Sequence, residues 1–217
     1  MMGFYSTVAF FQQGGVFMYP ILLAFAVGMA IAFERWLELN RIRGANQKMW
    51  DVLNPVLASG EFDKAREMAS KDKSSLAQML GMGLARQGAV RRREDIEIAM
   101  EESMMEIIPQ LEKRTPYVAL LANIATLLGL LGTIMGLIQA FTAVSNANPA
   151  EKADLLSASI SVAMNTTAFG LMSAIPLLLF HAKLTSTTGH IVDSLEMASV
   201  KALNTISNYS KRRFDGS

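Results

Sequence analysis

The chain has 217 residues, of which 51% are hydrophobic and 18% charged, and its formal net charge is +1. It is too apolar for an ordinary soluble domain and too charged for a protein that lies wholly in a bilayer, so part of it is expected in the membrane and part in water. Its near-neutral charge gives no reason to expect nucleic acid or another acidic partner. The absence of cysteine excludes disulfides and thiolate metal sites, and two histidines alone make no metal centre.

The N-terminal stretch, residues 1–33, has no charged side chain. Gln12-Gln13-Gly14-Gly15 interrupts this stretch, which predicts an interfacial helix over residues 1–15 and a first transmembrane helix over 16–34. The second of these is near the lower length limit for crossing a bilayer, about 17 residues.

Residues 35–115 are rich in Ala, Leu, Met, Glu and Arg and are predicted to be helical, with Ser74 as an N-cap. Pro109 and Pro116 are expected to interrupt or kink the last helix of this region. We expect long helices that continue out of the bilayer rather than a separately folded domain. Arg91-Arg92-Arg93 is typical of a solvated helix start, with contact to anionic membrane lipid or to an acidic patch on a partner as the alternative.

Two further stretches carry no Asp, Glu, Lys, Arg or His: 117–145, which is 29 residues long, and 155–180, which is 26 residues long. Both exceed the roughly 20 residues that cross a bilayer. The predicted elements are therefore a second transmembrane helix (116–145), a link (146–154), a third transmembrane helix (155–181) and a C-terminal helix and tail (182–217). The predicted fold class is an all-α membrane protein.

Small residues recur along both stretches at the heptad spacing of three and four. In the second span they are Ala119, Ala122, Thr126, Gly129, Thr133, Gly136, Ala140 and Ala143; in the third they are Ser159, Ala163, Thr166, Gly170 and Ser173. Small residues let helix backbones approach closely in lipid. The seam is therefore expected to serve helix packing or to line a pore with hydroxyls.

The distribution of basic residues predicts the orientation. Of 20 Lys and Arg residues, Lys152 alone falls in the link between the second and third spans. By the positive-inside rule, the N-terminus and residues 146–154 are expected on the outer, periplasmic side and the C-terminus in the cytoplasm.

No ionisable side chain falls in the middle of any span. Intramembrane carboxylates normally mark proton relays, and a hydroxyl does not titrate in the physiological range. If the protein serves proton transport, another chain must supply the carboxylate. The two histidines flank the third span, so no Ser/His/Asp arrangement is expected, and we predict that the chain is not an enzyme and binds no cofactor.

Two long motifs resemble one family. Residues 127–141 read LLGLLGTIMGLIQAF, and residues 159–176 read SISVAMNTTAFGLMSAIP. Both are similar to signatures of the MotA/TolQ/ExbB proton channel family. Three spans in 217 residues resemble ExbB, and next TolQ, more than the four-span MotA. In two places the chain departs from the pattern, because Val162 stands where a Glu is common and Thr126 where a Pro is frequent.

The resemblance implies a homopentamer around a central pore in the bacterial inner membrane. Within the pore it implies an ExbD- or TolR-like single-span subunit that supplies an essential Asp, and it implies a TonB-like protein as a further partner. The expected pore-facing residues are Thr133, Thr167, Thr166, Asn165 and Ser161. The expected packing seam is Gly129, Gly132, Gly136, Ala163, Gly170 and Pro176.

Three alternatives remain open at this point. The transported ion is expected to be H⁺, with Na⁺ at Thr133, Thr166 and Thr167 as the second choice because the common Glu is replaced. The work driven is TonB-dependent outer-membrane transport, or TolQ-like envelope constriction. A non-conducting membrane scaffold would use the same small-residue seam for assembly only.

Overall fold

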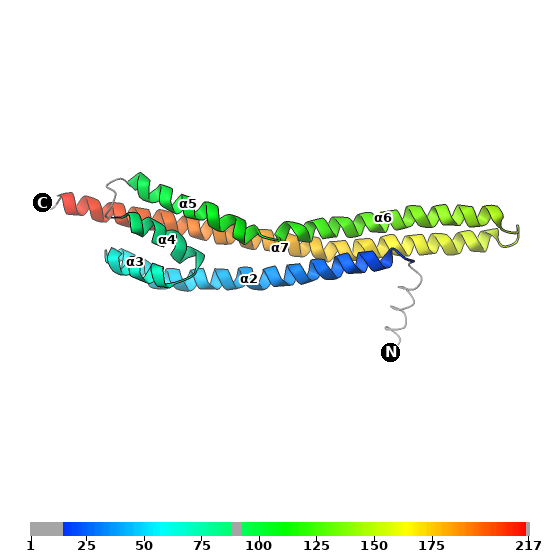
Figure 1. The fold of residues 1–217 in the computed structure, drawn as a ribbon, viewed down its shortest axis with the longest axis horizontal. Helices are drawn as coiled ribbons and strands as arrows, with labels where there is room; N and C mark the ends of the chain where they lie inside the picture. Colours follow the sequence, from blue (N-terminus) through cyan, green and yellow to red (C-terminus); the bar gives the residue numbers. More distant parts are fainter. Residues whose placement is uncertain (1–14, 88–92, 216–217) are drawn as a thin grey trace, which may run out of the picture. The chain divides into compact units, whose positions relative to one another are not determined.

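The computed structural model describes residues 15–87 and 93–215, and within these ranges the protein is helical (Figure 1). The helices are α2 (Met18–Ala58), α3 (Phe62–Lys71), α4 (Ser75–Arg86), α5 (Arg93–Glu112), α6 (Thr115–Asn146) and α7 (Lys152–Asp215). Most of the predicted interfacial helix, residues 1–14, lies outside the described residues, as do Arg91 and Arg92. Arg93 begins α5.

Three stretches of helix are long and apolar enough to cross a membrane. They lie within Met18–Ala58, Arg93–Asn146 and Lys152–Tyr209. The predicted all-α class with three apolar helices is therefore confirmed. Pro176 lies inside α7, which continues as one helix of 64 residues.

The chain forms two compact units. The first, which we call the hairpin unit, comprises the described residues up to Glu34 together with Arg114–Lys183; the second, the bundle unit, comprises the described residues of Arg35–Lys113 and those from Leu184 onward. The chain passes between them within α2, at the turn before α6, and within α7. The sequence predicted long continuous helices without a separate folded region, whereas the structure has both.

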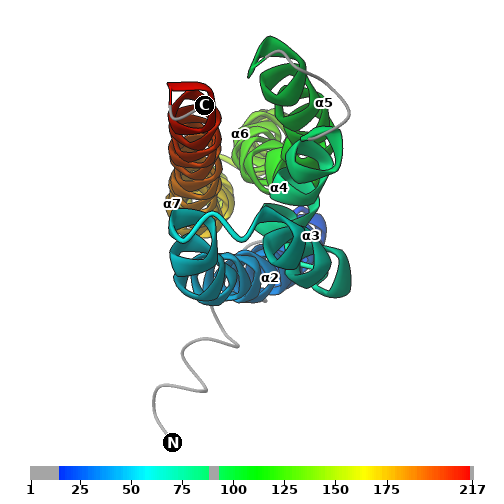
Figure 2. The same ribbon diagram turned by 90° about the vertical axis from the view of Figure 1, so that its left-hand side faces the viewer.

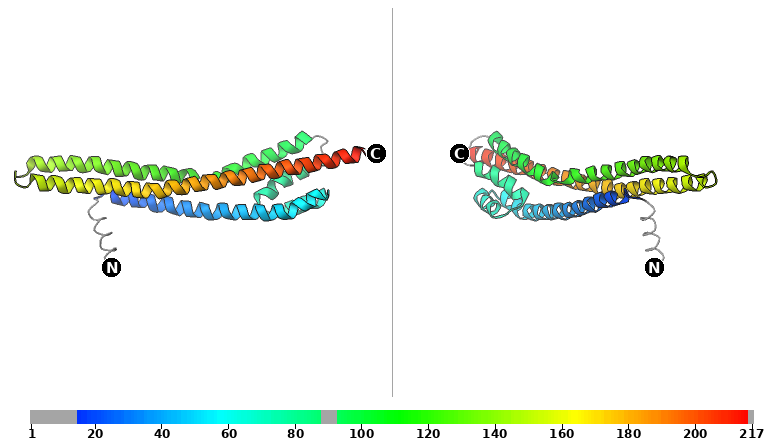
Figure 3. Two further views of the ribbon diagram at one scale, coloured as in Figure 1. Left: turned by 180° about the vertical axis from the view of Figure 1, so that it is seen from behind. Right: turned by 45° about the vertical axis from the view of Figure 1, so that its right-hand side comes forward.

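In the hairpin unit, α6 and the first part of α7 run antiparallel and side by side, joined by a short link (Figures 1 and 3). The start of α2 packs against them, and a Cβ added at Gly28 would lie 2.8 Å from Leu177. The turn before α6 is made by Arg114, whose φ is 64°, and Arg114 also pairs with Glu34 at 3.7 Å. An interruption at Pro109 does not occur, because α5 continues past it to Glu112, whereas the helix does end before Pro116, which lies in the first turn of α6.

In the bundle unit, α4 lies between α3 and α5 (Figure 2). Large apolar side chains fill its interior because this segment must bury them from water. Those that are almost fully buried are Leu39, Leu53, Leu57, Met79, Leu80, Met100, Leu111, Leu184 and Ile191.

Polar side chains complete the helix ends of the bundle unit. The predicted N-cap Ser74 is confirmed, since its hydroxyl accepts a hydrogen bond from the Ala77 amide at 3.3 Å. At the other end of the unit, the buried guanidinium of Arg35 donates to the carbonyl of Leu111 at 2.7 Å. The carbonyls of the last turn of a helix have no partner within that helix, so Arg35 caps the C-terminal end of α5.

Candidate functional site

Two glycines, Gly129 on α6 and Gly170 on α7, face each other in the hairpin unit. A Cβ added at Gly170 would lie 2.7 Å from the Ala125 carbonyl oxygen and 3.0 Å from the Gly129 Cα. A Cβ added at Gly129 would lie 3.2 Å from the Gly170 Cα. The helices therefore meet backbone to backbone, which is what a seam of small residues permits.

About one helical turn along from this contact, the hydroxyls of Thr133 and Thr167 form a hydrogen bond across the seam. Thr167 also donates to the Gly129 carbonyl at 2.8 Å. The Thr133 hydroxyl lies 3.3 Å from the Ala163 carbonyl and 3.4 Å from the Gly129 carbonyl. Two hydroxyl and two carbonyl oxygens thus converge; we call these four groups the oxygen cluster. Both threonines are half-buried.

The other predicted seam residues pack around the cluster. A Cβ at Gly132 would clash with the Thr166 methyl, and one at Gly136 would lie 2.8 Å from the Ala163 Cβ. The hydroxyl of Thr166 donates to the Val162 carbonyl of its own helix at 3.0 Å, and the side chain is buried. Pro176 is half-buried further along α7.

Ser161 and Asn165 lie on another face of α7. A helix turns by about 100° per residue, so Asn165 is roughly 200° from Thr167 and only about 40° from Ser161. Ser161 is exposed and Asn165 is half-exposed. Of the five residues predicted to face the pore, Thr133 on α6 and Thr166 and Thr167 on α7 therefore lie at the seam, whereas Ser161 and Asn165 lie on another face of α7.

The oxygen cluster can accept and pass hydrogen bonds but has no group that titrates near neutral pH. Each threonine has one proton, so the four oxygens offer more acceptor sites than donors. Oxygen-only ligand sets suit hard cations. The cluster can therefore hold a hydrogen-bond donor, such as a protonated carboxyl, or contribute oxygens to a partly dehydrated cation.

Reasoning from side-chain types missed half of the oxygen cluster. The carbonyls of Gly129 and Ala163 are backbone groups that every residue possesses. The one signal available was the close spacing of small residues, which predicts that a neighbouring helix can reach the backbone.

These features define a multi-span helical membrane protein with a tight, hydroxyl-bearing seam. Residues 71–197 match the model of the MotA/TolQ/ExbB proton channel family. The chain is 30% identical over 190 residues to an ExbB-like biopolymer transport protein of Synechocystis sp., covering 84% of this chain and 72% of that one.

Two further relatives carry the names ExbB and TolQ. An ExbB homologue of Methanothermobacter thermautotrophicus is 26% identical over 91% of this chain and 70% of its own length. The Tol-Pal system protein TolQ of Haemophilus influenzae is 36% identical over 40% of this chain and 37% of its own. This chain belongs to the MotA/TolQ/ExbB family, which is a family of channels rather than of enzymes.

Proposed function

We propose that this chain is the ExbB-like subunit of an ion-driven motor in the bacterial inner membrane. Its client is TonB-dependent transport across the outer membrane, and the chain assembles as a homopentamer. Family membership and the ExbB-like names of relatives that cover most of the chain support this proposal.

The observation that carries the mechanism is the oxygen cluster without a titratable group. Thr133 and Thr167 can orient a donor but cannot release a proton at neutral pH. An ExbD- or TolR-like subunit in the pore must then supply the Asp that binds and releases the ion. In this scheme H⁺ passes on the partner's carboxyl, and the threonines hydrogen-bond to it. Na⁺ is the second candidate, with the cluster's oxygens as ligands.

The test is a pair of near-isosteric variants, Thr133→Val and Thr167→Val, each of which removes one hydroxyl. Thr142→Val is the matched control, because Thr142 lies on α6 as Thr133 does, is exposed, and its hydroxyl donates only to the Ile138 carbonyl. We expect both cluster variants to lose outer-membrane uptake while the assembly still purifies intact. Normal uptake in both would contradict the assigned role of the hydroxyls.

Native mass spectrometry of the chain, purified gently from its own membranes, tests the assembly. We expect five copies with two copies of a small single-span partner that carries an Asp. A homo-oligomer without such a partner would make the scaffold hypothesis the leading one. Uptake measured with a proton gradient and then with a sodium gradient identifies the ion.

A TolQ-like role is the second candidate, favoured by the 36% identity to TolQ over 86 residues. Deleting the gene separates the two roles, since loss of envelope integrity with normal uptake would point to the TolQ-like role.

The proposed orientation places residues 146–154 in the periplasm and the C-terminus in the cytoplasm. It is testable with introduced cysteines because the chain has no cysteine of its own. A cysteine introduced at Asn148 should react with an impermeant maleimide added outside the inner membrane, and one at Lys201 should not.

A further inference from the structure

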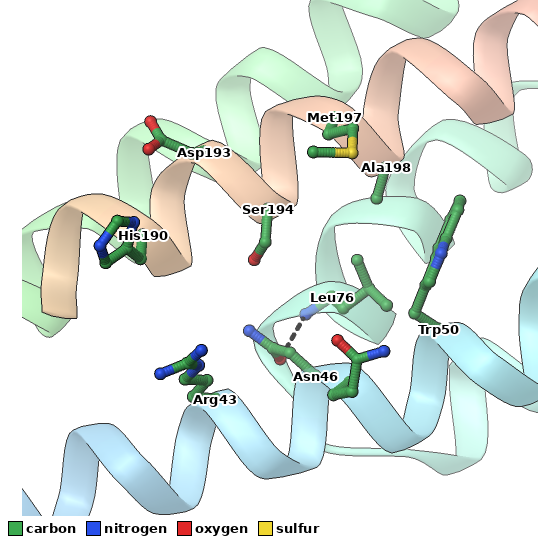
Figure 4. A pocket seen from close by; sticks show the side chains of 10 residues that line it. Arg43, Asn46, Trp50, Leu76, His190, Asp193, Ser194, Met197 and Ala198 are labelled. Atoms are coloured by element: carbon green, nitrogen blue, oxygen red, sulfur yellow. Dashed lines mark hydrogen bonds between the residues drawn. The ribbon is translucent and has the colours of Figure 1, made fainter.

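The bundle unit contains a pocket of about 560 Å³ between α2, α4 and α7 (Figure 4). This volume lies within the range of small-molecule sites, roughly 300–1,000 Å³. None of the residues that line it belongs to the oxygen cluster, and the proposed motor function makes no use of it.

The floor of the pocket holds a buried amide with one end unpaired. Asn46 is 5% exposed, and its side-chain oxygen accepts a hydrogen bond from the Leu76 amide at 3.1 Å. This bond fixes which end of the amide is the oxygen, because a flipped amide would set two donors against each other. Asn46 lines the pocket, and its Nδ2 is a buried donor with no hydrogen-bond partner among the described residues. A buried donor left unpaired costs about 1–3 kcal/mol, so an acceptor is expected beside it.

The polar side of the pocket favours a negatively charged acceptor. Arg43 lies one turn before Asn46 on α2 and forms no ion pair with any described residue. His190 and Ser194 line the facing side on α7. In Figure 4 the Ser194 side chain points toward α2, while the carboxylate of Asp193 lies on the upper side of α7. The lining therefore holds one cation, Arg43, and one carboxylate, Asp193, and in Figure 4 the carboxylate lies on the side of α7 away from α2.

The other side of the pocket is apolar. Trp50, Leu76 and Ala198 line it, and the Lys201 ammonium lies 5.8 Å from the centroid of the Trp50 ring. Lys201 adds positive charge close to the pocket and holds the indole in place. An occupant that meets both sides has an anionic end and an apolar body of about the size of a ring.

Membrane lipid is a poor candidate for this occupant. Asn46 follows Phe33, the last residue of the first charge-free stretch, by 13 residues along α2, which is about 20 Å of helix. Ser194 follows Phe180 by 14 residues along α7, about 21 Å. The headgroup layer on each side of a bilayer is only about 5–8 Å thick. The occupant must therefore come from the water phase.

We propose that this pocket binds a small water-soluble anion that carries a phosphate or carboxylate beside an apolar, ring-sized body. The anionic group accepts from the Asn46 amide and pairs with Arg43. The body packs against Trp50 and Leu76. The site is independent of the oxygen cluster, so it stands or falls separately from the proposed motor function.

The test uses the full chain in detergent micelles with 5-fluorotryptophan and ¹⁹F NMR. The chain has two tryptophans, so Trp50 reports on the pocket and Trp36 serves as an internal reference. The Trp36→Phe variant assigns the two signals. The probe is phenyl phosphate, with phenol and inorganic phosphate as comparators. We expect a saturable shift of the Trp50 signal with phenyl phosphate, a weaker effect of phosphate, and no saturable effect of phenol.

Two variants tie this binding to the pocket. Asn46→Asp keeps the oxygen that accepts from Leu76 but replaces the donor with a negative charge, and should weaken binding by at least about tenfold. Arg43→Gln removes the cation at an exposed position and should also weaken binding about tenfold. It keeps the proposal testable if Asn46→Asp fails to fold. Arg41→Gln is the matched control, because it removes an exposed arginine two residues away and should leave binding unchanged.

Several outcomes would overturn the proposal. One is an equal shift of both tryptophans, which would report partition of the probe into the micelle. Another is equal binding by wild type and Arg43→Gln. Mass spectrometry of small molecules that co-purify with the chain from its own membranes gives a second measurement. An anion enriched with wild type over Arg43→Gln supports the proposal, and its absence together with a failed probe titration refutes it. A partner's peptide crosslinked through a cysteine at Ser194, in place of a small molecule, would also refute it.

Discussion

In the hairpin unit α6 and α7 meet at small residues, whereas the interior of the bundle unit is filled by large side chains. Leu127 and Phe141 on α6 are 63% and 64% exposed, while Met79 and Leu80 on α4 are at most 1% exposed. Lipid tails are as apolar as leucine, so large side chains gain nothing by turning inward there, and close packing of small residues holds the helices. Water reverses this preference. The α6–α7 contact thus follows a different packing rule from the interior of the bundle unit, although Met18, Ile21 and Leu177 of the hairpin unit are also fully buried.

The largest expected effect is loss of a buried side chain from the bundle unit. Leu80→Ala should destabilise this unit by about 2–5 kcal/mol, since a cavity is left where water cannot enter. Hydrogen exchange of the full chain in detergent, followed by mass spectrometry, should show faster exchange in peptides from α3, α4 and α5. Leu127→Ala is the control in the hairpin unit and should change little. Equal effects of the two variants would contradict the comparison.

The next expected effect comes from adding a single methyl group to the hairpin unit, where the first came from removing a large side chain from the bundle unit. Gly170→Ala places a Cβ against the Ala125 carbonyl and should cost about 1–3 kcal/mol through overpacking. Gly189→Ala is matched on the same helix, where a Cβ meets nothing within 4 Å, and should be neutral or stabilising by about 0.5–1 kcal/mol. Thermal loss of helicity by circular dichroism measures both. A harmless Gly170→Ala would mean that the backbones do not meet as described.

Arg35 is the strongest polar element of the bundle unit. Arg35→Lys keeps the charge but loses the planar group that reaches the Leu111 carbonyl, and should cost about 1.5–3 kcal/mol. Exchange should rise in peptides that cover the end of α5. Arg41→Lys, at an exposed position, is the control and should leave exchange unchanged. Full protection of α5 in Arg35→Lys would show that the carbonyls do not need this donor.

Removing the N-cap of α4 should have a smaller effect. Ser74→Ala leaves the Ala77 amide unpaired and should cost about 0.5–2 kcal/mol. Ser75→Ala, one residue further on, is the control because Ser75 has already entered the helix. Urea denaturation of the detergent-solubilised chain measures the difference, and identical midpoints for the two variants would exclude a capping role.

The smallest effect is expected from surface charge on α3. The hydrogen bond from Lys71 holds the pKa of the Glu67 carboxyl below its ordinary value of 4.5, and Lys64 does the same for Glu61. A lowered pKa means that the pairs stabilise α3 above pH 4.5 and lose this effect as the pH falls through the folded-state value. Glu67→Gln should therefore differ from wild type slightly near about pH 6 and not near about pH 2, and high salt should shrink the difference. A difference that grows in acid would contradict the sign.

The sequence predicted the parts of the fold that depend on composition. Charge-free stretches gave the three apolar helices, and Ser74 gave a helix start because its hydroxyl suits a free amide. The compact bundle unit was missed, because the sequence of a helix does not show whether it packs on its neighbours or extends alone.

The candidate site was predictable only in part. The family motifs placed Thr133 and Thr167 among the pore-facing residues, but the carbonyls of Gly129 and Ala163 were indicated only by the spacing of small residues, which predicts that a neighbouring helix can reach the backbone. Ser161 and Asn165 were grouped with them on the family resemblance, although the helical turn sets them on another face of α7. Arg35 was read as one basic residue among many, because burial and a distant carbonyl partner cannot be seen in a linear pattern.

The glycine contact between α6 and α7 also governs how the hairpin unit can transmit force. Sliding α7 by one turn past α6 would set Thr166 or Ala174 opposite Gly129 in place of Gly170. Neither side chain fits where backbones already touch, so we expect the two helices to resist sliding and to move as one rigid pair. A displacement or rotation applied at one end of the pair would then be transmitted to the other end with little loss.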